Sequence, residues 1–338
     1  MKRFAFYALC ALFFTPAYAA QSPDEAARFL AGLPVREAGL AALESQPSWA
    51  AHAEKLGRSW TRMEERQIVK VRGWAAAMMP EATRSQAAVF YFFSGPDFLY
   101  AQTFFPNSAD YILCGTEPVG TVPDMAQMPP GALEADLENL RRALETMLTT
   151  HYFITKDMRV DLTRGQVAGT LPLLYVFLAR TGCSIRGVST NPTGAQIDFT
   201  GPQGQRQTLH YFKTDLSNGG ANTAFLAFCK KHAPGMSLVK SASYLLHGDG
   251  FSTARNFLLA NSSVIVQDDS GIPLRAFDPQ RWRLRFCGNY EGPIELFKEH
   301  YQPDLAAAYQ RSNPAALGFA FGYAWQAAKG ALLLATPR

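Results

Sequence analysis

The chain has 338 residues, of which 48% are hydrophobic, 12% aromatic and 18% charged, and its 32 basic and 28 acidic side chains give a formal net charge of +4. This composition excludes a disordered chain, a collagen-like chain and a coiled coil, and the length is enough for about two domains. Because so small a charge gives no concentrated basic face for phosphates, we expect no nucleic-acid partner.

The first residues predict a secretory signal peptide. Lys2 and Arg3 precede eleven consecutive apolar residues, Phe4–Phe14, and the small-residue pattern Ala17–Ala19 follows. We therefore expect residues 1–19 to be removed and the protein to be periplasmic or secreted. The apolar run is too short to span a bilayer, and no later run reaches the roughly 18 residues that a helix needs for this, so we expect no transmembrane segment after signal cleavage.

Four cysteines follow the predicted cleavage site, namely Cys114, Cys183, Cys229 and Cys287. In an oxidising compartment this even number allows two disulfides, and buried free thiols are the alternative. There is no Cys-x-x-Cys pair and no cysteine–histidine cluster at zinc spacing, so we expect no metal site. The phosphate loop, the HExxH motif, the GxSxG elbow and the GxGxxG fingerprint are all missing, and we expect no cofactor.

Residues 20–85 predict a helical lead-in. Ser22, a proline and two acidic residues form a typical helix start, and a second helical stretch over Trp49–Met79 stops at Pro80. Residues 86–190 predict a first α/β unit. It opens on Val89–Phe93, an aromatic and β-branched run that is typical of a strand buried on both faces.

Further elements follow in both halves of the chain. The first unit continues with helical spacing from Phe98 to Phe105, an apolar run at Tyr111–Leu113 and helices at Ala132–Thr150 and Pro172–Arg180. Residues 191–338 predict a second α/β unit with a C-terminal hairpin. It begins with a hairpin joining Ile197–Phe199 to Leu209–Phe212 and a helix at Ala224–His232.

The C-terminal residues predict strands. Arg281, Arg283 and Arg285 alternate with apolar residues, as expected of an edge strand protected by charge, and an acidic envelope polymer is an alternative explanation for them. Large apolar residues alternate with small ones over Leu317–Trp325, which predicts a strand with Leu332–Leu334 as its partner.

The strand–helix–strand order of the first unit recurs in the second. Tyr91–Ile112 overlays Tyr244–Ile265 without a gap at an offset of 153 and gives six identities in 22 positions. The sequence therefore predicts an α/β fold with two related βαβ units around residues 88–118 and 238–273 in one mixed sheet. A helical N-terminal lead-in and antiparallel hairpin additions complete this fold, and residues 86–338 form one integrated domain. Chance agreement is the alternative, since Ser237–Leu246 alone also fits a helix.

Ligands of parallel βαβ units bind beyond the carboxyl ends of the strands. Side chains predicted at that edge are Ser94, Asp97, Glu117, His247, Asp249, Asp268 and Asp269. The catalytic candidates are Asp268, Asp269, Glu117 and His247, because carboxylates beside a histidine can act as acid and base. The ligand-binding candidates are Ser94, Asp97, Asp249 and Arg255. Helix capping by Asp97 and Asp249 and a plain turn at Asp268–Gly271 are the structural alternatives.

These patterns leave three functions open. The first is recognition of a small molecule or a cell-envelope component in a cleft at the strand ends. The second is hydrolysis by the acidic cluster with its histidine, and the third is a structural or assembly role without a pocket. Because the usual nucleophile and metal motifs are missing, the sequence favours binding and leaves open whether the protein is an enzyme.

Overall fold

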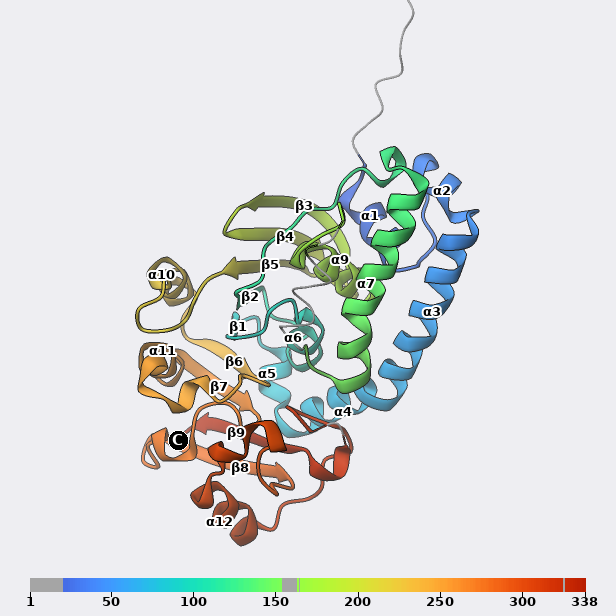
Figure 1. Cartoon of the computed structure of the whole chain (residues 1–338). Helices are drawn as coiled ribbons and strands as arrows, with labels where there is room; N and C mark the ends of the chain where they lie inside the picture. The colour runs from blue at the N-terminus through green and yellow to red at the C-terminus, as the bar shows by residue number, and fades with distance from the viewer. Residues whose placement is uncertain (1–20, 154–162, 164, 325) are drawn as a thin grey trace, which may run out of the picture.

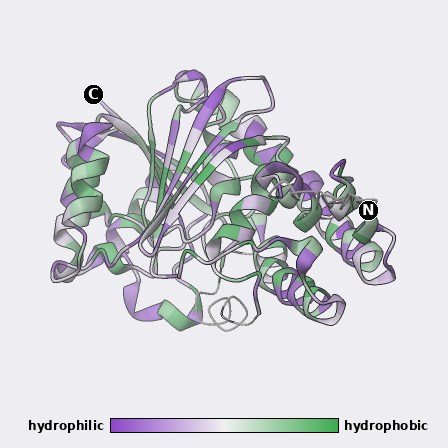
Figure 2. Cartoon of the chain, turned by 90° about the horizontal axis from the view of Figure 1, so that it is seen from above, coloured by the Kyte–Doolittle hydropathy of each residue, from purple (hydrophilic) through white to green (hydrophobic). Residues whose placement is uncertain are grey.

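The chain folds into a mixed α/β structure built on one nine-stranded sheet (Figure 1). The computed structural model describes residues 21–153, 163, 165–324 and 326–338, so the predicted signal peptide lies outside the described residues. Figure 2 shows the strands from above as a twisted layer with helices on both sides. The predicted fold class is confirmed: the sheet is mixed, helices surround it and the N-terminal region is helical.

The predicted helical lead-in packs against the sheet. Its elements are α1 (Pro23–Leu30), α2 (Ala38–Glu44), α3 (Pro47–Met63), the π-helix η1 (Glu64–Ile68), α4 (Val69–Met78) and α5 (Pro80–Arg84). Proline lies in the first turn of α1, α3 and α5, where the missing N–H group has no intrahelical partner. Phe29, Leu56 and Val71 are buried in the largest core cluster, so these helices share the core of the sheet.

Five parallel strands form the centre of the sheet in the order β5, β2, β1, β6, β7. Their bounds are β1 (Val89–Tyr91), β2 (Asp110–Gly115), β5 (Arg206–Lys213), β6 (Gly235–Val239) and β7 (Ser262–Gln267). Antiparallel strands extend both edges, namely β4 (Gly194–Thr200) and β3 (Ser184–Asn191) beyond β5, and β9 (Ala331–Pro337) and β8 (Trp282–Gly288) beyond β7. The predicted hairpin is β4–β5, and the predicted arginine-rich edge strand is β8.

Helices cover both faces of the sheet, which explains the continuous apolar run in β1. Val89 and Tyr91 point into one core and Phe90 and Phe92 into the other. The first core includes α6 (Phe98–Phe104), α7 (Pro130–Thr150) and α9 (Thr170–Arg180), and the second includes α10 (Thr223–Lys231) and α11 (Ser252–Asn261). Of the described helices, none is long and apolar enough to cross a membrane.

The remaining elements are short helices in the connections. They are η2 (Met125–Gln127), η3 (Leu245–His247), η4 (Asp249–Phe251), η5 (Leu274–Ala276), η6 (Glu295–His300), α12 (Pro303–Ser312) and η7 (Ala327–Lys329). The chain between β8 and β9 holds η6, α12 and η7, so the C-terminal strands pair over a long connection rather than through a tight hairpin turn.

Both predicted βαβ units are present, as β1–α6–β2 and as β6–α11–β7. At the offset of 153 the helices and the second strands coincide, but the first strands do not. Tyr91 ends β1, whereas Tyr244 lies in a loop beyond the end of β6 at Val239. The ungapped overlay is therefore wrong in its first strand, and common ancestry of the two units stays a prediction.

The strand predicted over Leu317–Trp325 is wrong for the residues that the structure describes, and Trp325 lies outside them. Phe319 and Phe321 are buried and pack edge-on against Trp74 and Phe104, so these aromatic residues belong to an irregular segment inserted into the core. No strand of the described chain pairs with this segment, and the side-chain amide of Gln67 takes that role at Ala320. It donates to the Ala320 carbonyl oxygen and accepts a hydrogen bond from the Ala320 N–H group.

The four described cysteines are buried free thiols, so the two possible disulfides are not formed. Cys183 and Cys287 belong to one core cluster, whereas Cys114 and Cys229 belong to the other. Cys183 directly precedes β3 and Cys287 lies in β8, at opposite edges of the sheet, which places that pair beyond the reach of a disulfide.

Candidate functional site

A cavity of about 430 Å³ lies at the carboxyl ends of the central parallel strands. The chain runs from β1 to β2 on one side and from β6 to β7 on the other, so the order of the strands reverses between β1 and β6. Open α/β sheets bind ligands at such a reversal. The described lining residues are Tyr91, Phe93, Ser94, Gly95, Asp97, Cys114, Gly115, Thr116, Glu117, Tyr152, Phe153, Thr214, Asp215, Leu216, Lys240, Ser241, Ala242, Ser243, Leu245 and Phe251.

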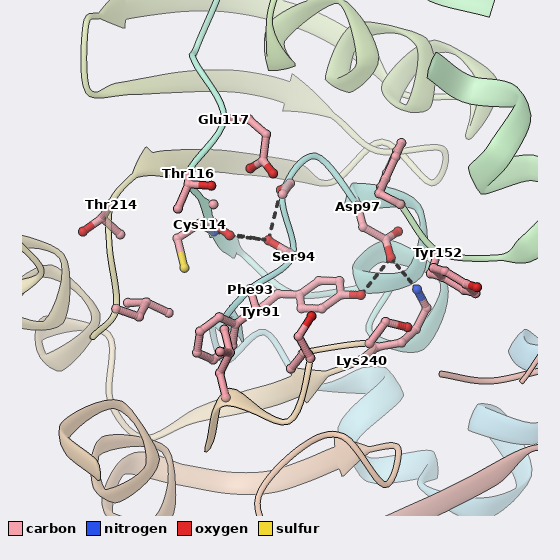
Figure 3. Close-up of a pocket in the computed structure, with 18 of the residues that line it drawn as sticks. Tyr91, Phe93, Ser94, Asp97, Cys114, Thr116, Glu117, Tyr152, Thr214 and Lys240 are labelled. Atoms are coloured by element: carbon pink, nitrogen blue, oxygen red, sulfur yellow. Dashed lines mark hydrogen bonds and ion pairs between the residues drawn. The ribbon is translucent and has the colours of Figure 1, made fainter. Parts of the chain in front are cut away.

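A buried ion pair joins the two sides of this cavity (Figure 3). The Nζ atom of Lys240 lies 3.0 Å from Oδ2 of Asp97, and the Tyr91 hydroxyl donates a hydrogen bond of 2.7 Å to the same oxygen. Asp97 also caps α6 by accepting the Tyr100 N–H, and Lys240 lies 4.3 Å from the centre of the Tyr100 ring. Burial and the Asp97 charge raise the pKa values of Tyr91 and Tyr100, so both phenols stay protonated.

Ser94 fixes the loop after β1 to the end of β2. Its Oγ lies 3.2 Å from the carbonyl oxygen of Cys114 and accepts the N–H of the same residue. Close packing continues at Gly115, where a Cβ atom would lie 2.9 Å from the backbone Cα atom of Gly95, so glycine is favoured at this position. Tyr211 donates to the Glu117 carbonyl oxygen at 3.0 Å, which places this buried glutamate at the cavity wall.

The backbone around the cavity is strained. Of the six described non-glycine residues with positive φ, four lie in the loops after β1 and β6: Phe93, Ser241, Ser243 and Tyr244, with φ between 52° and 61°. Such conformations persist only where surrounding contacts impose them, and they concentrate at functional sites. Ser241 also has a buried Oγ with no hydrogen-bond partner among the described residues. A polar group of this kind is available to a ligand.

Asp268 and Asp269 fix the loop after β6 on the side that faces away from the cavity. Asp268 is buried and accepts the N–H of Ser241 at 3.2 Å and the Ser270 hydroxyl at 2.7 Å. Tyr244 donates to Asp269 at 2.6 Å. Burial raises the pKa of Asp268 to about 7, helped by the neighbouring Asp269, and burial raises the pKa of Asp269 to about 6. Neither carboxylate lines the cavity, so the predicted convergence with Glu117 is not seen.

His247 lies with this second group rather than in the cavity. It belongs to η3, and its ring meets those of Tyr244 and His300 edge-on at 5.2 and 5.9 Å. Burial, followed by the nearby Arg275, lowers the pKa of His247 to about 4. The structure therefore divides the four predicted catalytic residues: Glu117 lines the cavity, Asp268 and Asp269 bind the loop after β6 from the interior, and His247 lies in that loop but outside the lining.

The ligand-binding candidates also separate. Ser94 and Asp97 line the cavity, whereas Asp249 and Arg255 do not. Asp249 is exposed, 4.0 Å from Arg255. Arg255 donates to the carbonyl oxygens of Leu246 and Gly248 and so closes the turn before α11. This pair stabilises the loop from outside.

The sequence prediction missed Lys240, Tyr91 and Ser241. The overlay predicts the first strand of the second unit around Tyr244, and the alternative is a helix over Ser237–Leu246, so neither puts Lys240 at the end of a strand. A lysine that follows the apolar run Gly235–Val239 is the signal that was available, because a charge there marks the end of a buried strand.

Neither a metal cluster nor a similarity to known proteins identifies the ligand of this cavity. Within the described part of the chain, no cluster of three or more histidine, cysteine or acidic side chains is placed to hold a metal ion. Comparisons of the chain with family models, with curated proteins and with solved structures find no match. The function is therefore inferred from the geometry of the cavity.

Proposed function

We propose that this chain is an exported protein that binds a small hydroxyl-bearing molecule of the cell envelope in the cavity beside β1, β2, β5 and β6. One observation carries the proposal. The cavity lies at the reversal of strand order, and three of its lining residues, Phe93, Ser241 and Ser243, have strained backbone conformations. A site shaped before the ligand arrives loses less entropy on binding. The signal-peptide pattern at residues 1–19 supports export.

The lining indicates the kind of ligand. Among the described lining residues, acidic side chains (Asp97, Glu117 and Asp215) outnumber the single ammonium group, that of Lys240. This balance favours a neutral or cationic ligand and opposes an anionic one. Hydroxyl groups from Ser94, Thr116, Thr214, Ser241 and Ser243 provide hydrogen bonds, and the rings of Phe93, Tyr152, Phe153 and Phe251 provide flat apolar walls. A sugar or an amino sugar has both kinds of surface.

The other two functions have less support. Hydrolysis by the acidic cluster requires Asp268, Asp269 and His247 to reach the ligand, and none of the three lines the cavity. A purely structural role gives no reason for a cavity of about 430 Å³ with strained borders.

The proposal is tested by thermal unfolding of the mature chain with three matched sugars, namely glucose, glucosamine and glucuronic acid. We expect glucosamine or glucose to raise the Tm and glucuronic acid to leave it unchanged. A ligand at 100 times its Kd stabilises a protein by about 2.7 kcal/mol, so the shift is readily measured. The Glu117→Gln variant keeps the side-chain shape but removes the charge, and we expect it to abolish any preference for glucosamine over glucose.

The control is Asp249→Asn, which removes an exposed carboxylate outside the cavity and should leave every shift as in the parent. Equal shifts in the parent and in Glu117→Gln, or a preference for glucuronic acid, would contradict the proposed ligand class. No shift with any of the three sugars would contradict the proposal itself.

A further inference from the structure

A second hollow runs along the N-terminal helices and shares no lining residue with the cavity. It consists of two parts of about 340 and 320 Å³, and both parts are lined by Ser59, Arg62 and Leu148. One wall is formed by α3, η1 and α4. The other is formed by α7, which runs beside α3 (Figure 1), together with Gly318–Ala320 and Ala327. We call this hollow the basic groove.

The charge of the basic groove is strongly one-sided. Its cationic lining residues are Lys55, Arg58, Arg62, Arg66, Lys70 and Arg141, and its only described acidic lining residue is Glu145. Arg58 pairs with Glu54, but no ion pair is found within the described part of the chain for the other five cations. Burial lowers the pKa of His151 at the end of the groove to about 4, so this side chain adds no charge at neutral pH.

The π-helix η1 lies in the middle of this row. In an α-helix, residues four apart drift around the axis by about 40° at each step. The i to i+5 hydrogen bonds of a π-helix make a wider turn that counters the drift. Arg62, Arg66 and Lys70 therefore stay along one wall, while Gln67 of the same turn is buried and bound to Ala320. The irregular turn thus serves both the core and the groove.

We propose that the basic groove binds an extended acidic segment of a partner protein. Guanidinium groups form paired hydrogen bonds with carboxylates, so the cations of the groove provide its main contacts. The apolar side chains of Leu56, Met63, Leu148 and Phe319 are buried and form its floor. From Lys55 to Lys70 the helical wall is about 22 Å long, which matches about seven residues of extended peptide. A flat membrane surface does not reach both walls of a concave groove, which favours a peptide.

Fluorescence anisotropy of a labelled seven-residue peptide with five glutamates and two leucines tests this proposal on the mature chain. We expect the parent to bind it, and the triple variant Arg62→Gln, Arg66→Gln and Lys70→Gln to bind at least tenfold more weakly at low salt. The matched control is Arg281→Gln, Arg283→Gln and Arg285→Gln, which removes three exposed cations from β8 and the residue before it and should change the Kd less than twofold.

Glu145→Gln removes the charge of the one acidic residue among the described lining residues and should therefore tighten peptide binding. Unfolding of the variant cannot produce such a gain in affinity. Equal weakening in both triple variants, or no binding by the parent, overturns the proposal. Preferential binding to vesicles containing phosphatidylserine that depends on Arg62, Arg66 and Lys70 overturns the peptide as the partner. Glu117→Gln should leave peptide binding unchanged, because the proposed sugar site is separate.

Discussion

The loop after β1 and the loop after β6 border the same cavity but are fixed by different interactions. The first runs directly into α6, and Asp97 fixes it by capping that helix and pairing with Lys240. The second is longer and depends on groups that follow β7, since Asp268 and Ser270 accept the N–H groups of Ser241 and Ala242. One loop therefore depends on a charge pair and the other on a carboxyl group with a raised pKa.

Because of this difference, the two loops should respond to different changes, one to the removal of a charge and the other to pH. Removing a charge should disturb the first loop, because Asp97 and Lys240 are both buried. A change of pH near neutrality should disturb the second loop, because burial places the pKa of Asp268 at about 7. The three stability experiments below use this difference.

The largest effect is expected from Asp97→Asn. The variant keeps the shape of the side chain but leaves the buried ammonium group of Lys240 without its anion, so the free energy of unfolding should fall by about 3 to 5 kcal/mol. Urea unfolding of the parent and the variant measures this loss. A loss below about 1 kcal/mol would show that the pair is not what fixes the first loop.

Lys240→Met in the same background is the matched control. The double variant removes both charges and replaces the ammonium stem with an apolar side chain of similar length. We expect it to recover most of the stability that Asp97→Asn loses, because no uncompensated charge remains. If the double variant is less stable than Asp97→Asn, the ion pair is not the reason for the loss.

The next largest effect is on pH dependence. The folded pKa of Asp268 is raised from 3.8 to about 7, so between these two pH values the folded state holds more protons than the unfolded chain. The stability that the protonated Asp268 contributes is therefore lost as the pH rises through about 7. His52 and His247, with pKa values lowered from 6.5 to about 4, act in the opposite direction and add stability as the pH rises from 4 to 6.5.

Asp268→Asn should therefore change the slope of stability against pH. The variant keeps an acceptor oxygen for Ser241 but cannot ionise, so it should gain on the order of a few kcal/mol relative to the parent between pH 4 and pH 8. Urea unfolding at several pH values measures the two slopes. Parallel curves for parent and variant would mean that Asp268 does not titrate across this range.

Some of this arrangement was predictable from sequence and some was not. The buried strand Val89–Tyr91 was predictable because its apolar run contacts cores on both faces. The segment at Leu317–Phe321 has the alternation of a strand but is satisfied by the distant Gln67, a partner that no local pattern indicates.

Some residues of the site were likewise predictable from the sequence, and others were not. Ser94, Asp97 and Glu117 were found because they follow strands, and the rule that ligands bind at strand ends applies directly to them. Lys240 was missed because the end of β6 was misplaced, and the same error placed His247 at the cavity. Asp268 and Asp269 do follow the end of β7, but their side chains bind the loop after β6 instead of lining the cavity. An error of a few residues in one strand end is enough to exchange a lining residue for a supporting one.

The smallest effect concerns the far end of the loop after β6. Arg255 contacts both an exposed carboxylate, that of Asp249, and two backbone carbonyl oxygens, those of Leu246 and Gly248. Because an exposed ion pair contributes little and a half-buried hydrogen bond contributes about 1 kcal/mol, Arg255→Gln should lower stability by about 1 kcal/mol. Asp249→Asn should leave it unchanged. Equal losses in the two variants, measured by urea unfolding, would mean that the ion pair closes this turn, and the second loop would then depend on charge as the first one does.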